Sequence, residues 1–148
     1  NLTDITELST ASTGSSLILD VPTGKTLITS EYDKNVYPRL KEVADNALCL
    51  AKYKCENPLC SIALFTRKDG TTTYTEAHHL LPLCYQKDFD YSLDVEANVV
   101  SLCPHCHCLL HYGQDKEILL RNLYNTRINR LKKCKLEISY ESLLLMYR

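Results

Sequence analysis

The spacing of apolar residues predicts one helix in the first half of the chain and further helices in the second half. Between residues 38 and 54, apolar side chains recur every three or four positions, as they do on one face of an amphipathic helix. The same spacing returns at 116–131, where the basic residues lie largely off the apolar stripe. A shorter helix is expected at 140–147, with Ser139 as its N-cap. Another helix should begin near Pro104.

Runs of β-branched residues predict short strands between these helices. Residues 62–66 and 72–77 flank a polar turn and are expected to pair with each other. The second of these strands leads directly to two adjacent histidines. A further apolar stretch at 99–102 runs into Cys103. The pattern as a whole predicts an α+β fold.

The first 37 residues are expected to form an N-terminal extension. Runs at 16–21 and 26–32 flank the turn Pro22-Thr23-Gly24-Lys25, which predicts a β-hairpin followed by a linker. The remaining residues, 38–148, are expected to form one domain, because 148 residues is about the size of a single ordinary domain. The chain opens without a methionine, as a processed chain or an excised fragment would.

The charge and the hydropathy of the chain indicate where the protein is found in the cell and which partners it could bind. No apolar run approaches the length that crosses a bilayer, and the polar start lacks the layout of a signal peptide, so a soluble, cytoplasmic protein is expected. The net charge of −1 offers no global attraction to nucleic acid. Basic residues are nevertheless concentrated between 121 and 135, where no acidic residue occurs: Arg121, Arg127, Arg130, Lys132, Lys133 and Lys135.

Eight cysteines in an intracellular chain point to metal binding rather than to disulfides. Cys55 and Cys60 form a C-x4-C pair, and Cys103 and Cys106 form a C-x2-C pair. Each spacing can place two thiolates on one tetrahedral zinc ion. No such pairing is visible for the remaining four: Cys49, Cys84, Cys108 and Cys134.

The histidines are clustered in the same region as the second cysteine pair. His107 and His111 are four residues apart, so on a helix they lie on one face and can share a metal ion. His78 and His79 end a predicted strand, where successive side chains point to opposite sides. One of them can therefore bind the same metal while the other faces a reacting group. Three imidazoles leave positions open on the ion, as a catalytic site requires.

These motifs together resemble a known family. The segment EAHHLLP at 76–82, Asn98, and the segment LCPHCH at 102–107 followed by His111 are similar to the HNH endonucleases. The resemblance covers about residues 40–147 and is closest to restriction-type members whose active site is surrounded by a four-cysteine zinc staple. It implies a ββα-metal finger with structural zinc, flanked by helices.

The resemblance also implies a role for each matched residue. His79 would be the general base that takes a proton from water, and Asn98 would orient it. The catalytic metal, one Mg²⁺, Mn²⁺, Ni²⁺ or Zn²⁺ ion, would be held by His78, His107 and His111. The structural Zn²⁺ would be held by Cys55, Cys60, Cys103 and Cys106.

The function expected from this resemblance is hydrolysis of phosphodiester bonds in double-stranded DNA. The preferred hypothesis is the nuclease domain of a restriction or anti-phage defence protein, with modification-dependent cleavage and a separate recognition domain as open extensions of it. Residues expected to grip the DNA backbone are Arg121, Arg127, Arg130, Lys132 and Lys133. A homodimer would allow both strands to be cut. Two alternatives stay open: a homing or mobile-element nuclease, and a non-catalytic zinc module that binds nucleic acid.

Overall fold

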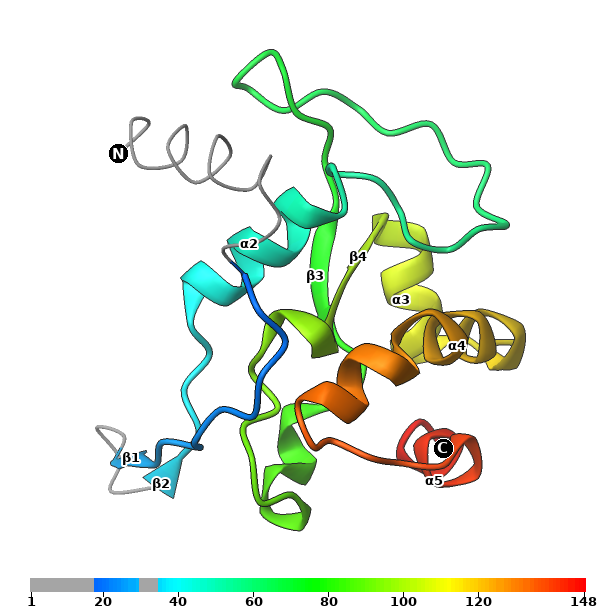
Figure 1. The fold of residues 1–148 in the computed structure, drawn as a ribbon. Helices are drawn as coiled ribbons and strands as arrows, with labels where there is room; N and C mark the ends of the chain where they lie inside the picture. Colours follow the sequence, from blue (N-terminus) through cyan, green and yellow to red (C-terminus); the bar gives the residue numbers. More distant parts are fainter. Residues whose placement is uncertain (1–17, 30–34) are drawn as a thin grey trace.

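The computed structural model describes residues 18–29 and 35–148, and its centre is a small antiparallel sheet (Figure 1). Strand β3 (Glu76–His79) pairs with β4 (Val99–Leu102), with Ala77 opposite Ser101 and His78 opposite Val100. All four residues of β4 are buried, because helices cover both faces of this sheet. The chain therefore has a mixed α+β fold.

Four α-helices surround the sheet within the described residues (Figure 1). They are α2 (Lys41–Leu50), α3 (Pro104–Tyr112), α4 (Glu117–Lys133) and α5 (Tyr140–Met146). Short 3₁₀ helices, η2 (Leu83–Asp88) and η3 (Glu96–Asn98), lie in the connection between β3 and β4. In these parts of the chain, no helix combines the length and the apolar character that crossing a bilayer requires.

The two faces of the sheet pack against different helices. On one face, Val43 and Ala47 of α2 pack against Val99 and Ala77. The other face belongs to the main core, where Leu102 of β4 packs with buried leucines of α3, α4 and α5: Leu110, Leu120, Leu123, Leu131 and Leu143. Neighbouring residues of β3 therefore enter different layers of the molecule.

The helices expected from the apolar spacing are confirmed, although α2 is shorter at both ends than the expected 38–54. Helix α3 begins at Pro104, and Cys103 caps it through a thiol that accepts a hydrogen bond from Cys106 N. Helix α5 begins after Ser139, whose hydroxyl accepts a hydrogen bond from Ser142 N at 3.1 Å. Such caps satisfy backbone N–H groups that have no partner within the first turn.

The pairing of the central strands differs from the sequence-based prediction. Residues 62–66 and 72–77 do not form a pair of strands and meet beside their turn. A single bridge joins Thr66 and Thr73, Arg67 N donates to Thr72 O, and Tyr74 N donates to Phe65 O. Glu76–His79 pairs instead with Val99–Leu102. Burial explains the choice, because β4 is apolar and enclosed whereas Ile62 and Phe65 are exposed.

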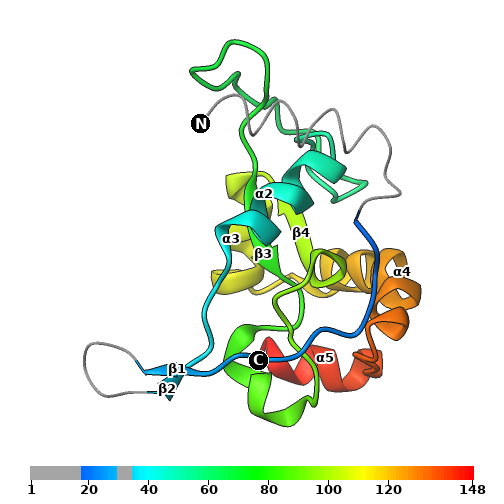
Figure 2. The same cartoon turned by 60° about the vertical axis from the view of Figure 1, so that its left-hand side comes forward.

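Part of the expected N-terminal hairpin, residues 16, 17 and 30–32, lies outside the described residues. Within the described part, residues 18–21 form no strand, and β1 (Ile28–Thr29) pairs with β2 (Asn35–Val36). The expected turn bonds to the domain instead: Ser92 N donates to Thr23 O, and Lys25 Nζ donates to Phe89 O at 2.7 Å. Figure 2 shows this extended segment in blue, running across the domain.

Candidate metal centres and active site

Four cysteines from two distant parts of the chain converge into one cluster. Cys55 and Cys60 come from the loop after α2, and Cys103 and Cys106 come from the start of α3. Their sulfur atoms all lie within 4.8 Å of one another. Sequence spacing predicted both pairs, and the fold brings the two pairs together.

The cluster fits a structural zinc ion by geometry and by charge. Cys60 Sγ and Cys103 Sγ are 3.6 Å apart, close to the edge of about 3.8 Å in a tetrahedron with Zn–S bonds of about 2.3 Å. Burial raises the pKa of the Cys55 and Cys106 thiols above the usual value. A dication would supply the charge that holds four thiolates together. Asn57 Nδ2 also donates to Cys106 Sγ at 3.3 Å.

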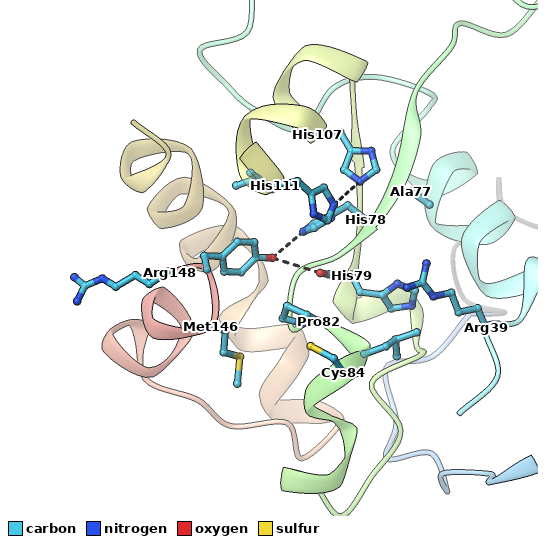
Figure 3. A pocket seen from close by; sticks show the side chains of 13 residues that line it. Arg39, Ala77, His78, His79, Pro82, Cys84, His107, His111, Met146 and Arg148 are labelled. Carbon is cyan, nitrogen blue, oxygen red and sulfur yellow. Dashed lines mark hydrogen bonds between the residues drawn. The ribbon is translucent and has the colours of Figure 1, made fainter. Parts of the chain in front are cut away.

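Three histidines form a second cluster beside the first. His78 comes from β3, and His107 and His111 come from successive turns of α3; their nitrogen ligand atoms all lie within 4.8 Å of one another. Their rings gather at one point in Figure 3. His107 Nε2 and His111 Nε2 are 3.1 Å apart, close to the 3.3 Å or so expected for two imidazoles on one tetrahedral zinc ion.

Burial keeps the central histidine of this cluster neutral. The pKa of His78 falls to about 3, first because the ring is buried and then because His107 and His111 lie close by. The Tyr147 hydroxyl donates to Leu80 O, so its oxygen accepts from His78 Nε2 at 2.7 Å. This leaves Nδ1 of His78 with its lone pair, the form in which imidazole binds metals.

Glu76 orients a second histidine of the cluster. It lies on the same side of β3 as His78, and its Oε1 accepts a hydrogen bond from His107 Nδ1 at 2.9 Å. Its Oε2 accepts from the Tyr74 hydroxyl at 2.6 Å. These two hydrogen bonds, Tyr74 first, lower the pKa of Glu76, so it is a carboxylate at neutral pH. The proton on Nδ1 of His107 leaves Nε2 free to bind a metal ion.

The Glu76→Gln variant should bind the metal of the histidine cluster about 10-fold to 100-fold more weakly, because carboxylates behind histidine ligands raise their basicity. Titration with Ni²⁺ against a chromophoric chelator measures this affinity. Glu141→Gln removes an exposed carboxylate on α5 and should leave the affinity unchanged. Equal affinities for Glu76→Gln and the wild type would show that Glu76 has no part in metal binding.

His79 points away from the cluster and contacts a buried acid. Its Nε2 lies 2.7 Å from Asp94 Oδ1, and the two side chains are only 12% and 6% exposed. The opposite orientation of His78 and His79 is the one expected at the end of a strand. Sequence reasoning missed Asp94, because nothing in its neighbourhood distinguishes it from the loop acids Asp88 and Asp90.

Asn98 lies near His79 but contacts the backbone around it. Its Oδ1 accepts a hydrogen bond from Leu81 N at 2.8 Å, and its Nδ2 donates to Leu81 O and Leu93 O. Within residues 18–29 and 35–148, the Asn98 side chain makes no hydrogen bond to the His79 ring. Asn98 therefore fixes the backbone after His79 and the backbone before Asp94.

His78, His79, His107 and His111 line a single open pocket of about 520 Å³. The sheet, α3 and the end of α5 form its walls, and Figure 3 shows the labelled side chains that face it. Two basic residues also line it: Arg39, from the segment before α2, and Arg148, at the end of the described chain. Sequence reasoning missed Arg39, because it belongs to no motif that marks it as part of a site.

The five basic residues expected to bind DNA do not line this pocket. Arg121, Lys132 and Lys133 are exposed on α4, and the Arg121 guanidinium lies 3.6 Å from the centre of the Tyr140 ring. Arg130 is half-buried and forms a two-point ion pair with Asp20 of the N-terminal extension, at 2.7 and 3.0 Å.

The expectation that Arg127 binds DNA is wrong, because Arg127 lies in the interior rather than on a surface that could contact DNA. Its side chain is 4% exposed, and its Nη2 donates to both carboxylate oxygens of Glu56 at 2.7 and 2.9 Å. Its Nη1 donates to the backbone oxygens of Glu96 and Ala97. Arg127 thus ties α4 to η3 and to the loop that carries Cys55.

This chain is similar in sequence and in fold to known restriction enzymes. No model of a known protein family matches the chain. The type IV methyl-directed restriction enzyme EcoKMcrA of Escherichia coli (strain K12) is 39% identical over 101 residues, which is 68% of this chain and 33% of that enzyme. The chain therefore matches about a third of the length of this curated relative.

A solved structure gives a similar result. The type IV phosphorothioation-dependent restriction endonuclease ScoMcrA superposes on 73% of this chain with a TM-score of 0.50 and 28% sequence identity, over 20% of its own chain. Sequence and fold thus relate this chain to parts of two type IV restriction enzymes.

Proposed function

We propose that this chain is the nuclease unit of a restriction system, a DNA endonuclease of the HNH type that uses one divalent metal ion. The observation that carries the proposal is that two adjacent histidines, His78 and His79, make different contacts. His78 joins the metal-binding cluster, whereas His79 lies outside it and lines the same pocket. A module that only binds zinc has no use for the second histidine. Similarity to two restriction endonucleases supports this proposal over a homing or mobile-element nuclease.

The proposed catalytic metal would be held by His78, His107 and His111. Three neutral imidazoles suit Zn²⁺ or Ni²⁺ better than Mg²⁺, which prefers oxygen ligands. When bound, the ion supplies Lewis-acid stabilisation of negative charge on the phosphate and on the leaving 3′ oxygen. Glu76 and Tyr147 hold two of the three rings in place.

His79 would act as the general base. Its imidazole accepts a proton from a water molecule, the water oxygen forms a bond to phosphorus, and the bond from phosphorus to the 3′ oxygen breaks. The leaving oxygen takes a proton from solvent. The products are a 5′-phosphate and a 3′-hydroxyl.

Arg39 would bind the phosphate that is cleaved. Its side chain is exposed at the pocket, and a guanidinium forms paired hydrogen bonds with phosphate oxygens. Exposed Arg121, Lys132 and Lys133 on α4 would add contacts to the DNA backbone farther away.

The Arg39→Ala variant should therefore lose about 10-fold to 100-fold in kcat/KM for DNA cleavage, since a hydrogen bond to a charged group contributes about 1.5–3 kcal/mol. Arg39→Lys should recover part of the loss, because lysine keeps the positive charge but cannot form the paired hydrogen bonds of a guanidinium. Lys41→Ala removes a nearby cation with an 83% exposed side chain that lies outside the pocket, and it should cleave like the wild type. Steady-state cleavage of a labelled duplex measures all three. Wild-type kcat/KM in Arg39→Ala would exclude the phosphate contact.

The names of the similar proteins suggest the kind of DNA. One is methyl-directed and the other is phosphorothioation-dependent. We therefore propose that this nuclease unit serves a modification-dependent restriction system, in which a separate recognition domain selects the DNA.

The proposed function is tested by incubating the purified chain with supercoiled plasmid and added Mg²⁺, Mn²⁺, Ni²⁺ or Zn²⁺. Nicked or linear DNA should appear only with a divalent ion, and most rapidly with Ni²⁺ or Zn²⁺. His111→Ala removes an exposed ligand and should abolish nicking, whereas His105→Ala removes an exposed histidine outside the pocket and should retain it. Plasmid that is bound but never cut would favour the non-catalytic zinc module.

A further inference from the structure

The contact between His79 and Asp94 is buried, and both oxygens of the Asp94 carboxylate have a hydrogen-bond partner. Asp94 Oδ1 lies 2.7 Å from His79 Nε2, and Asp94 Oδ2 accepts a hydrogen bond from Leu40 N, also at 2.7 Å. The carboxylate is 6% exposed, so little water reaches it. Each oxygen therefore has one defined partner.

The surrounding backbone holds the Asp94 carboxylate in position. Asp94 N donates to Ser92 Oγ at 3.1 Å. The preceding residue, Leu93, is held at its N–H by Gln86 Oε1 at 2.7 Å and at its carbonyl by Asn98 Nδ2 at 2.8 Å. Gln86 and Asn98 are both essentially buried. The loop that presents Asp94 is thus fixed from both sides.

We propose that Asp94 is the positioning residue for His79, holding its ring with the proton on Nε2 so that Nδ1 is the atom that accepts a proton. This inference rests on the proposed role of His79 as general base. A carboxylate can only accept hydrogen bonds, so the neutral imidazole that faces it carries its proton on Nε2.

Asp94 thereby takes the orienting role that the sequence assigned to Asn98. Asn98 acts one step further away, because it fixes the backbone at Leu81 and Leu93 rather than the ring. The same Asp94 carboxylate, through Leu40 N, also anchors the residue after Arg39. One buried acid thus sets the position of the proposed base and of the segment that carries the proposed phosphate-binding arginine.

The Asp94→Asn variant separates positioning from folding. Leu40 N still needs an acceptor, so the amide oxygen of the new side chain should face it and the amide NH₂ should face His79. The ring must then accept at Nε2 and carry its proton on Nδ1, where it blocks the proposed base. The shape of the side chain and the bond to Leu40 N are preserved, so the fold should survive.

The experiment uses the zinc-loaded chain and measures the tautomer of His79 by ¹H–¹⁵N NMR, together with kcat, KM and Tm. The wild type should show the Nε2–H tautomer. Asp94→Asn should show Nδ1–H, with kcat lowered about 10-fold to 100-fold and with KM, Tm and zinc content unchanged. Asp88→Asn removes an exposed acid at the end of η2, in the same connection between β3 and β4, and should match the wild type in every measurement.

Two results would overturn the proposal: an Nδ1–H tautomer in the wild type, or an unchanged kcat in Asp94→Asn. The wild-type spectrum decides the matter even if the variant fails to fold. A wild-type chain that cuts no DNA with any metal would instead overturn the proposed function. The NMR measurement needs no substrate, so the two failures are distinguishable.

Discussion

The His79→Ala variant should fold, bind both metal ions and cleave plasmid DNA at least about 100-fold more slowly than the wild type. General base catalysis contributes about 10²- to 10⁴-fold to the rate of such reactions, and His79 lines the pocket without belonging to the metal-binding cluster of His78, His107 and His111. The metal cluster should be preserved, because the His79 ring points to the opposite side of β3 from His78 and bonds to Asp94. Gel analysis of supercoiled, nicked and linear DNA measures the rate.

The matched control for this variant is His105→Ala. His105 is exposed at the start of α3 and lies outside the pocket, so its loss should leave cleavage within about twofold of the wild type. The loss of the ring in His79→Ala leaves Asp94 Oδ1 without its partner, which should lower the free energy of unfolding by about 1–3 kcal/mol. Equal cleavage rates for His79→Ala and the wild type would show that another group activates the water.

The Cys103→Ser variant should lose zinc and unfold. Cys103 is fully buried, caps α3 and contributes one of four sulfurs to the cysteine cluster. Structural zinc contributes about 10–16 kcal/mol to the folding of small zinc peptides, whereas a whole domain is stable by only about 5–15 kcal/mol. Loss of the ion should therefore remove the cooperative thermal transition.

Cys108→Ser is the matched control, because Cys108 lies exposed on the same helix and outside the cluster. It should bind the same amount of zinc as the wild type and melt at the same temperature. Zinc content per chain and far-UV circular dichroism measure both outcomes. A folded, zinc-free and active Cys103→Ser protein would contradict a structural role for the cluster.

Local sequence patterns predicted the parts of the site that depend on spacing. The i, i+4 spacing of His107 and His111 placed both rings on one face of α3, and alternation along β3 turned His78 and His79 to opposite sides. The two cysteine pairs were visible because the two members of each pair are close together in the sequence. Such signals survive folding because each depends only on a short stretch of the chain.

Contacts between distant segments were not predictable in this way. Nothing in the sequence around Glu76 indicated that α3 would bring His107 against its carboxylate. Asp94 and Arg39 carry no motif, and only the packing of the loop and of the segment before α2 places them beside the site.

The buried position of Arg127 was indicated by its place on the helix, but its charge suggested a position on the surface. It lies four residues after Leu123 and four before Leu131, so it falls on the apolar stripe of α4 that enters the core. Its charge suggested a surface role, but Glu56 and two backbone carbonyls compensate that charge in the interior. Helical phase was a better guide to its position than residue type.

We propose separate duties for the two metal sites: the cysteines hold the fold and the histidines hold the catalytic ion. A direct experiment begins with a chain that retains one structural zinc ion per molecule after a weak chelator has emptied the histidine cluster. Ni²⁺ is then added in steps while plasmid nicking is measured. Nicking should be absent at the start, rise in proportion to added Ni²⁺ and level off at one equivalent. Full nicking before Ni²⁺ is added, or none at any loading, would contradict this division.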